Sequence, residues 1–179
     1  MEETHWYALA TSYCRELKLR SYLDTRGLET YIPMKYEFRE KNGRRERVLK
    51  PAIHNLIFVR SDRATLRSIK LVTTGSDSSF RWIMDTIKKE PIVISDRQMQ
   101  SFVKVCDSRL DGISYFNNKD VSYFTKGDKV RVASGPFEGI EGYLTRIHKD
   151  RCVVVVIDGL AAVATTFVHP SMLEKIKEE

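Results

Sequence analysis

The stretch from Lys126 to Ile147, KGDKVRVASGPFEGIEGYLTRI, constrains the fold of this chain more than any other. Residues 129–132 alternate charged and apolar side chains, which is the period-two pattern of a half-buried strand. Residues 134–136, SGP, predict a turn, because glycine tolerates a positive φ and proline presets its own. Gly139 and Gly142 fall inside the apolar–polar pattern that follows, where a glycine marks a sharp bend or a close backbone approach. Together these signals predict a small β-barrel.

The remaining C-terminal residues supply more strands of the same kind. Residues 151–157 are rich in valine, Asp158-Gly159 is a hairpin signal, and residues 160–168 predict the returning strand. Residues 171–176 predict a final short strand or turn. We therefore expect about five strands, enough to close a small barrel. The β-branched residues at 153–156 favour strands over helices. We therefore expect this segment to keep its barrel fold at all times and not to refold into helices.

Length and composition set outer limits. The chain has 179 residues, of which 42% are apolar and 30% charged, values typical of a globular protein with one large or two small domains. Its apolar runs are shorter than the roughly 18 residues that span a membrane, and its first residues, MEETHWYALA, do not resemble a signal peptide. The three cysteines form no C-x-x-C pair, which argues against a disulfide framework or a cysteine-based zinc site. We expect a cytoplasmic protein.

The net charge of +6 is unevenly distributed. Residues 1–110 hold 21 Lys and Arg against 14 Asp and Glu, whereas residues 111–179 hold 9 against 10. The basic N-terminal part is the candidate for contact with a polyanion, with a solvated basic surface as the alternative.

The N-terminal part predicts alternating strands and helices. Residues 5–10, HWYALA, predict a buried strand, and residues 13–26 a helix with a basic face that ends before Gly27. Residues 30–36 predict an edge or bulged strand, because they contain Pro33. The elements predicted next are a buried strand at 51–59, a short helix or turn at 62–69 capped by Asp62, and strands at 80–83 and 92–94. A final helix follows from Ser95-Asp96, with Met99, Phe102, Val103 and Cys106 on one stripe.

Residues 37–50 predict a hairpin, because Asn42-Gly43 suits a type I′ turn, in which both central residues have a positive φ. Residues 39–50 contain six basic and two acidic side chains. These charges either keep an exposed hairpin soluble or form a basic finger that meets a nucleic-acid backbone. The sequence leaves both interpretations open.

Two sets of residues resemble a known family. Gly135-Pro136-Phe137-Glu138-Gly139 and Gly142 resemble the KOW motif of NusG-type transcription factors and some ribosomal proteins. The N-terminal part resembles the NusG N-terminal domain through Trp6-Tyr7, residues 31–34 (YIPM), residues 56–59 (LIFV) and residues 94–96 (ISD). The resemblance covers nearly the whole chain.

The resemblance implies an α+β protein with three parts. These are an N-terminal α/β sandwich at residues 1–108, a linker at 109–123, and a five-stranded, SH3-like KOW barrel at 124–179. Ile53-His54-Asn55 stands where housekeeping members usually have Pro-Gly-Tyr, and residues 85–90 look like a small expansion. The chain therefore resembles the specialised RfaH and UpxY branches, which act on selected long operons, often for surface polysaccharides.

Members of this family bind RNA polymerase, which implies three sets of residues here. The clamp of the largest subunit would meet an apolar surface, and the second-largest subunit a short polar turn. The non-template DNA would meet the first helix, with the basic hairpin as a further candidate. The matching positions are Ala10, Leu56, Phe58, Phe80 and Ile83 for the clamp, Arg67, Ser68, Ile69 and Lys70 for the turn, and Arg15, Lys18 and Tyr22 for DNA. Arg44 and Arg45 of the hairpin join the DNA-binding candidates through their charge rather than through the resemblance. Their alternatives are an ordinary core and a solvated helix face.

The KOW domain would recruit a second partner, ribosomal protein S10 or the termination factor Rho, through Phe137 and the turn that includes Ile157 and Leu160. By bridging the polymerase channel, the protein would favour the closed, elongating enzyme and suppress pausing and termination. We expect a monomer without cofactor or metal.

Other classes of protein fit less well. The four histidines show no metal-ligand spacing, and no nucleophile–base pair or phosphate-binding glycine loop is visible, which disfavours an enzyme. A KOW-containing RNA-binding or ribosome-associated protein remains an alternative, although such a domain should be basic. A duplex-binding repressor lacks a helix-turn-helix pattern to support it.

Overall fold

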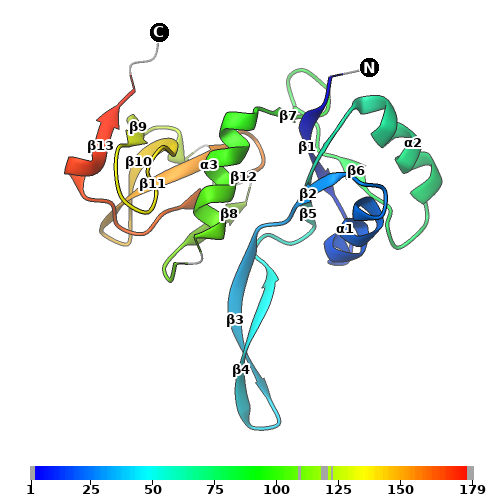
Figure 1. Ribbon diagram of the computed structural model, residues 1–179, viewed down its shortest axis with the longest axis horizontal. Coiled ribbons are helices and arrows are strands. Elements are labelled where there is room, and N and C mark those ends of the chain that lie inside the picture. The colour runs from blue at the N-terminus through cyan, green and yellow to red at the C-terminus, as the bar shows by residue number, and fades with distance from the viewer. Residues whose placement is uncertain (1–2, 109, 118–120, 122, 177–179) are drawn as a thin grey trace. The chain divides into compact units, whose positions relative to one another are not determined.

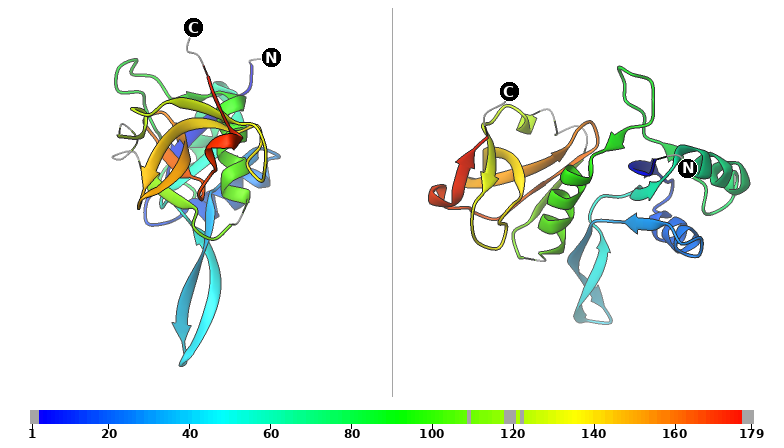
Figure 2. Two further views of the ribbon diagram at one scale, coloured as in Figure 1. Left: turned by 90° about the vertical axis from the view of Figure 1, so that its left-hand side faces the viewer. Right: turned by 45° about the horizontal axis from the view of Figure 1, so that its top comes forward.

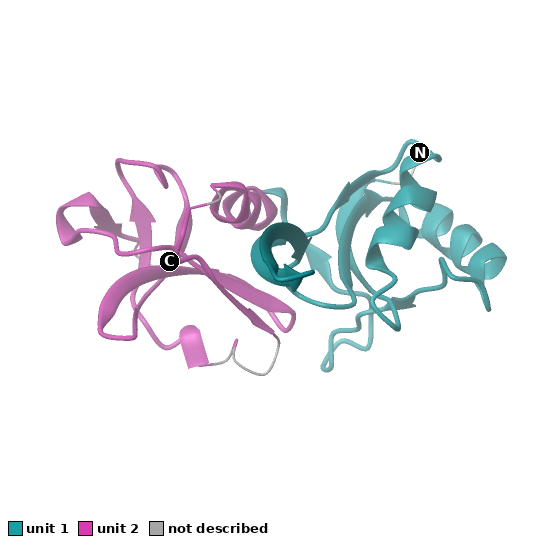
Figure 3. Cartoon of the chain, turned by 90° about the horizontal axis from the view of Figure 1, so that it is seen from below, with its two compact units in different colours: residues 1–96 teal, residues 97–179 magenta. Residues whose placement is uncertain are grey.

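The computed structural model describes residues 3–108, 110–117, 121 and 123–176. The chain divides into two compact units, Met1–Asp96 and Arg97–Glu179, which Figure 3 colours separately. Within the described residues, none of the helices is both long enough and apolar enough to cross a bilayer.

Unit 1 is built on an antiparallel sheet (Figure 1). Strand β1 (His5–Ala10) pairs with β5 (Leu56–Ser61), β6 (Arg81–Trp82) and β7 (Val93–Ile94), and β2 (Glu29–Tyr31) pairs with the other side of β5. The predicted buried strand at residues 5–10 is confirmed.

Two helices complete unit 1. Helix α1 (Glu16–Asp24) buries Leu19 and Leu23, and the chain leaves it through Gly27, whose φ is +71°. Helix α2 (Arg63–Thr73) begins at the predicted cap, because the Asp62 carboxylate accepts a hydrogen bond from the Thr65 amide at 2.7 Å. Both helices pack on one core with alternate residues of the central strands; this core contains Tyr7, Leu9, Leu19, Leu23, Ile32, Ile57, Val59, Leu66, Ile69 and Phe80.

Two predicted strands of unit 1 are wrong in extent. The strand expected at residues 30–36 is broken, because β2 ends at Tyr31 and β3 begins at Met34, after Pro33. Proline lacks the amide hydrogen that a continuous ladder needs. The strand expected at residues 51–59 begins only at Leu56, since Asn55 has a φ of +60° and interrupts the extended backbone.

The predicted hairpin is confirmed. Strands β3 (Met34–Lys41) and β4 (Arg44–Pro51) pair along their whole length, and the register closes at Lys41 and Arg44 around the predicted Asn42-Gly43 turn. Both turn residues have a positive φ, +52° and +71°. Figure 2 shows a twisted two-stranded ribbon that runs out from the sheet of unit 1, with which it shares no strand.

Unit 2 contains helix α3 and a six-stranded antiparallel sheet in the order β13-β9-β10-β11-β12-β8. The elements are α3 (Asp96–Asp107), β8 (Ser114–Asn117), β9 (Lys129–Val132), β10 (Glu141–Ile147), β11 (Asp150–Ile157), β12 (Ala161–Ala164) and β13 (Leu173–Lys175), with a short 3-10 helix at Pro170–Met172. The α+β class is confirmed. Among the described residues, however, the strand order has two ends and six strands, where the sequence predicts a closed barrel of five.

The additional strand lies within the expected linker at residues 109–123. Strand β8 pairs with β12, opposing Ser114 to Ala164 and Asn117 to Ala161. Residues 109, 118–120 and 122 of that segment lie outside the described residues. Helix α3 buries Met99, Phe102 and Cys106 as predicted, but Val105 is buried in place of Val103.

Gly142 permits the close approach of β10 and β11 that the sequence predicts. A Cβ atom at this position would lie 2.4 Å from the backbone oxygen of Val154. Real Cβ atoms do not approach a backbone atom this closely, so only glycine fits here. The strands β11 and β12 beyond it are fully buried along most of their length.

Candidate functional site

The basic face of α1 is held by an acidic residue from another segment of unit 1. Nη1 of Arg15 lies 3.1 Å from Oδ1 of Asp77, and Nζ of Lys18 lies 2.5 Å from Oδ2. The hydrogen bond from Lys18, followed by the charge of Arg15, lowers the pKa of the Asp77 carboxyl. The Asp77 carboxylate therefore binds both of the cations that the resemblance assigns to DNA phosphates.

Tyr22, the aromatic member of the same predicted set, is only partly exposed. Its ring packs against the core of unit 1, and the Arg26 guanidinium lies 4.7 Å from the ring centroid. The ring therefore already has a cation on one side.

The hairpin carries a second basic surface, and aromatic residues interleave it. The register places Tyr36, Phe38, Glu40, Arg45, Arg47 and Leu49 on one side of the ribbon, here called the aromatic–arginine face, with Glu40 directly opposite Arg45. The guanidinium of Arg45 lies 4.2 Å from the centroid of Phe38, and that of Arg47 lies 4.0 Å from the centroid of Tyr36. These pairs are diagonal neighbours on the two strands. Phe38 is 62% exposed, so its ring is accessible to a ligand.

Arg44, also predicted to contact DNA, lies beside the turn and opposite Lys41. The parity of the strand places it on the other side of the ribbon from Arg45. The hairpin thus presents cations on both sides of its tip.

The residues predicted to bind the polymerase clamp do not all share one surface. Ala10 is opposite Leu56 in the β1–β5 register, and Ala8 is opposite Phe58. Strand alternation puts Ala8, Ala10, Leu56 and Phe58 on the side of the sheet opposite the core that contains Ile57. Leu56 and Phe58 are buried, 4% and 0% exposed, whereas Ala10 is partly exposed.

The other two clamp positions lie elsewhere. Phe80 belongs to the helix-side core, where its ring makes an edge contact with Trp82 at 6.2 Å. Ile83 follows β6, is partly exposed, and its amide donates a hydrogen bond to the Ala8 oxygen at 3.2 Å. The structure therefore groups Ala10, Leu56 and Phe58, and separates Phe80 from them.

The predicted polar turn at residues 67–70 is part of a helix. These residues lie inside α2, where Ser68 donates to the Ala64 oxygen at 3.2 Å and Ile69 is buried in the core. The hydrophobic period of residues 63–73 continues through the segment and stabilises it as helix. Arg67 and Ser68 are exposed on its outer side.

The three residues predicted to bind a partner through unit 2 are buried. Phe137, Ile157 and Leu160 are 3%, 1% and 5% exposed. Asp158 and Gly159, between the last two, are exposed. Any contact at this turn would therefore be made first by polar and backbone atoms.

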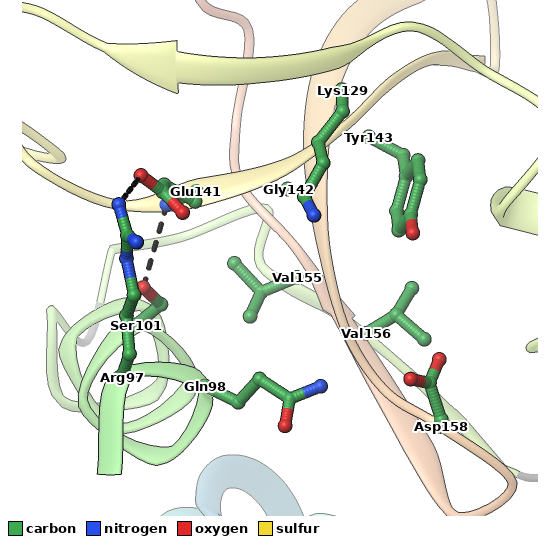
Figure 4. A pocket seen from close by; sticks show the side chains of 10 residues that line it. All are labelled: Arg97, Gln98, Ser101, Lys129, Glu141, Gly142, Tyr143, Val155, Val156 and Asp158. Carbon is green, nitrogen blue, oxygen red and sulfur yellow. Dashed lines mark hydrogen bonds and ion pairs between the residues drawn. The ribbon is translucent and has the colours of Figure 1, made fainter. Parts of the chain in front are cut away.

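Unit 2 also contains a cavity of about 130 Å³ beside α3 (Figure 4). Arg97 and Ser101 point from α3 toward Glu141, which also binds Arg131 at 2.7 Å. Pockets for drug-sized ligands measure about 300 Å³ or more. We interpret this site as an ion-pair network that joins α3 to the sheet of unit 2.

Sequence reasoning missed two kinds of residue in these surfaces. Tyr36, Phe38 and Arg47 could have been found, because the two-residue alternation on either side of Asn42-Gly43 places them on one face. Asp77 could not, since it sits in a polar loop and only the tertiary structure brings it to α1.

Comparison with known proteins gives a family match and a similar solved structure. The family described as "Transcription termination factor nusG" matches residues 4–103. A solved structure titled "Domain interaction in Thermotoga maritima NusG" is similar to this chain at 21% sequence identity, with a TM-score of 0.47, and the match covers 98% of each chain. No curated protein matches the sequence.

Proposed function

Because the chain belongs to the NusG family of transcription factors, we propose that it is a specialised elongation factor of the RfaH and UpxY kind. In this proposal it binds RNA polymerase in the cytoplasm and suppresses pausing and termination. It thereby promotes transcription of selected long operons, with polysaccharide biosynthesis as the expected class. The observation that carries the proposal is the family match over residues 4–103, which spans the sheet and helices of unit 1.

Contact with non-template DNA is supported by two basic surfaces in unit 1. Arg15, just before α1, and Lys18 in its first turn would bind phosphates, with Tyr22 at the edge of the contact. Arg44 and Arg45 at the hairpin tip would bind phosphates, while the neighbouring exposed ring of Phe38 offers a stacking surface for an unpaired base. The interleaving of cations and aromatic rings favours the basic-finger interpretation of the hairpin.

Contact with the clamp of the largest polymerase subunit is proposed for the sheet side that carries Ala10, Leu56 and Phe58, together with Ile83 and Phe80. Ala10 and Ile83 are partly exposed and would make the first contacts. The outer side of α2, with Arg67, Ser68 and Lys70 around the buried Ile69, would approach the second-largest subunit. Binding both sides of the channel stabilises the elongating state by differential affinity and needs no covalent chemistry.

Unit 2 would act as a KOW domain that recruits S10 or Rho near Phe137 and the turn between Ile157 and Leu160. Residues 111–179 carry nine basic and ten acidic side chains, which suits a protein partner better than RNA. This balance disfavours the alternative of a ribosome-associated RNA-binding protein.

A binding experiment with the full chain and RNA polymerase core tests the proposal. Ile83→Asp places a charge at the proposed interface, and Ile87→Asp, at a residue that is 90% exposed, is the matched control. We expect wild type and I87D to bind and I83D to bind at least about tenfold more weakly, the factor that corresponds to about 1.4 kcal/mol. The bound protein should also shorten pauses in transcription assays. Absence of binding by the wild-type chain contradicts the proposal and favours the RNA-binding alternative.

A further inference from the structure

Three side chains with metal-binding atoms meet at the entrance to α1. The thiol of Cys14, the carboxylate of Glu16 and the imidazole of His54 each offer one atom, and these atoms all lie within 4.8 Å of one another. Sγ of Cys14 is 3.9 Å from Nδ1 of His54. Two ligands of a tetrahedral zinc ion, with bonds of about 2.3 and 2.0 Å, lie roughly 3.6 Å apart. Small side-chain movements would therefore bring these atoms to bonding distance.

Glu16 supplies an independent indication of a ligand. It is only 1% exposed, and its Oε1 atom is buried without a hydrogen-bond partner. Its Oε2 atom accepts one long hydrogen bond, from the Thr11 hydroxyl at 3.4 Å. A buried carboxylate is costly unless it is paired or binds a metal. The unpartnered oxygen belongs to one of the three clustered side chains, where a bound cation would satisfy it.

The backbone around the cluster is held by hydrogen bonds between its two loops. The Cys14 amide donates to Oδ1 of Asn55 at 2.8 Å, and the Thr11 amide donates to the Asn55 backbone oxygen at 3.0 Å. These bonds fix the segment before α1 against the segment before β5, so Cys14 and His54 are presented together. Both are exposed, which leaves a path for an ion from solvent.

We propose that Cys14, Glu16 and His54 form a zinc site with an open fourth position for water. A thiolate and an imidazole select a transition metal such as Zn²⁺ over Mg²⁺ or Ca²⁺, which prefer oxygen ligands throughout. Zinc sites with three protein ligands plus one water draw these ligands from His, Glu and Cys side chains, the three types present here. The sequence predicts no such site, because the ligands are 40 residues apart and only the fold brings them together.

Cobalt binding to the chelator-treated full chain tests the proposal. A Co²⁺ ion with a thiolate ligand shows a charge-transfer band in the near ultraviolet, and tetrahedral Co²⁺ shows intense visible bands. We expect wild type to show both and Zn²⁺ to displace the Co²⁺. Cys14→Ser should abolish the charge-transfer band. His54→Gln and Glu16→Gln should weaken metal affinity by about tenfold or more, since even outer residues of metal sites contribute about that factor.

Two variants of unit 2 serve as controls. His148→Gln changes an exposed imidazole, and Cys152→Ala removes a buried thiol whose pKa is raised by burial. Both should bind Co²⁺ as wild type does. Because His54 is exposed, its substitution leaves the core intact, and Zn²⁺ should raise the Tm of wild type but not of H54Q. A missing charge-transfer band in wild type, or unchanged affinity in C14S, H54Q or E16Q, would overturn the proposal.

Discussion

Oδ1 of Asp77 lies 3.1 Å from Nη1 of Arg15, the residue before α1, and its second oxygen binds Lys18 in the first turn of that helix. The carboxylate thus takes the place that a nucleic-acid phosphate would take between the same cations. An intramolecular acidic group of this kind competes with DNA, so it lowers the affinity that the helix would otherwise have.

Removal of this carboxylate charge should therefore strengthen DNA binding. We expect Asp77→Asn to bind a single-stranded oligonucleotide more tightly than wild type. Its salt dependence should be steeper by roughly 0.7 in log–log slope for each additional phosphate that the freed cations neutralise. Fluorescence anisotropy at several salt concentrations measures both quantities. Asp128→Asn, which breaks the ion pair with Lys175 in unit 2, is the control and should leave binding unchanged. Equal affinity of D77N and wild type would mean that DNA does not use these cations.

The same ion pair predicts a dependence of stability on pH. The pKa of Asp77 is lowered in the folded protein, first by the hydrogen bond from Lys18. A group with a lowered pKa stabilises the fold above its unfolded pKa, and this contribution is lost as the pH falls through the folded value. The difference in urea midpoint between wild type and D77N should therefore be largest at neutral pH. It should vanish well below the ordinary aspartate pKa of about 3.9. A constant difference across this range would contradict the assignment.

The aromatic–arginine face of the hairpin should contribute to binding of unpaired bases. Phe38→Ala is expected to weaken binding of single-stranded DNA by about 1 kcal/mol or more, the value for loss of one stacked base. Val48→Ala, on the opposite side of the ribbon, is the matched apolar truncation and should have a smaller effect. Anisotropy titrations of the three proteins decide the point. If both truncations weaken binding equally, the ring acts through hairpin stability rather than through stacking.

Gly142 should be essential to the sheet of unit 2. A Cβ atom there would overlap the backbone of β11, so we expect Gly142→Ala to lower the free energy of unfolding by about 1–3 kcal/mol or more. Urea unfolding followed by circular dichroism measures the change. Arg146→Ala, an exposed site on the same strand, should stay close to wild type. A G142A protein as stable as wild type would show that the two strands can separate at no cost.

Local signals explain why much of the fold was predictable. The Asn42-Gly43 turn fixes the hairpin register by its own φ requirements, and Asp62 caps α2 through a bond to a residue three positions away. The buried strand at residues 5–10 has an apolar composition that only a core strand would carry. In each case the signal and the structure it produces lie within a few residues of each other.

Features that depend on distant partners were not predictable. Strand β8 forms in a polar segment because it pairs with the edge of β12. Phe80 packs in the helix-side core, whereas Leu56 and Phe58, predicted to share its surface, do not. The meeting of Cys14 with His54 likewise depends on bonds through Asn55. Which residues share a surface of unit 1 could thus be learned only from the tertiary structure, whereas the types of residue on these surfaces were visible in the sequence.

The β3–β4 ribbon shares no strand with the rest of unit 1, and most of its side chains are exposed. Residues can therefore be added or removed in pairs at its tip without disturbing the core. A change in the length or the charge of the ribbon would therefore alter which ligands it can contact. The folding of the sheet of unit 1 would stay the same.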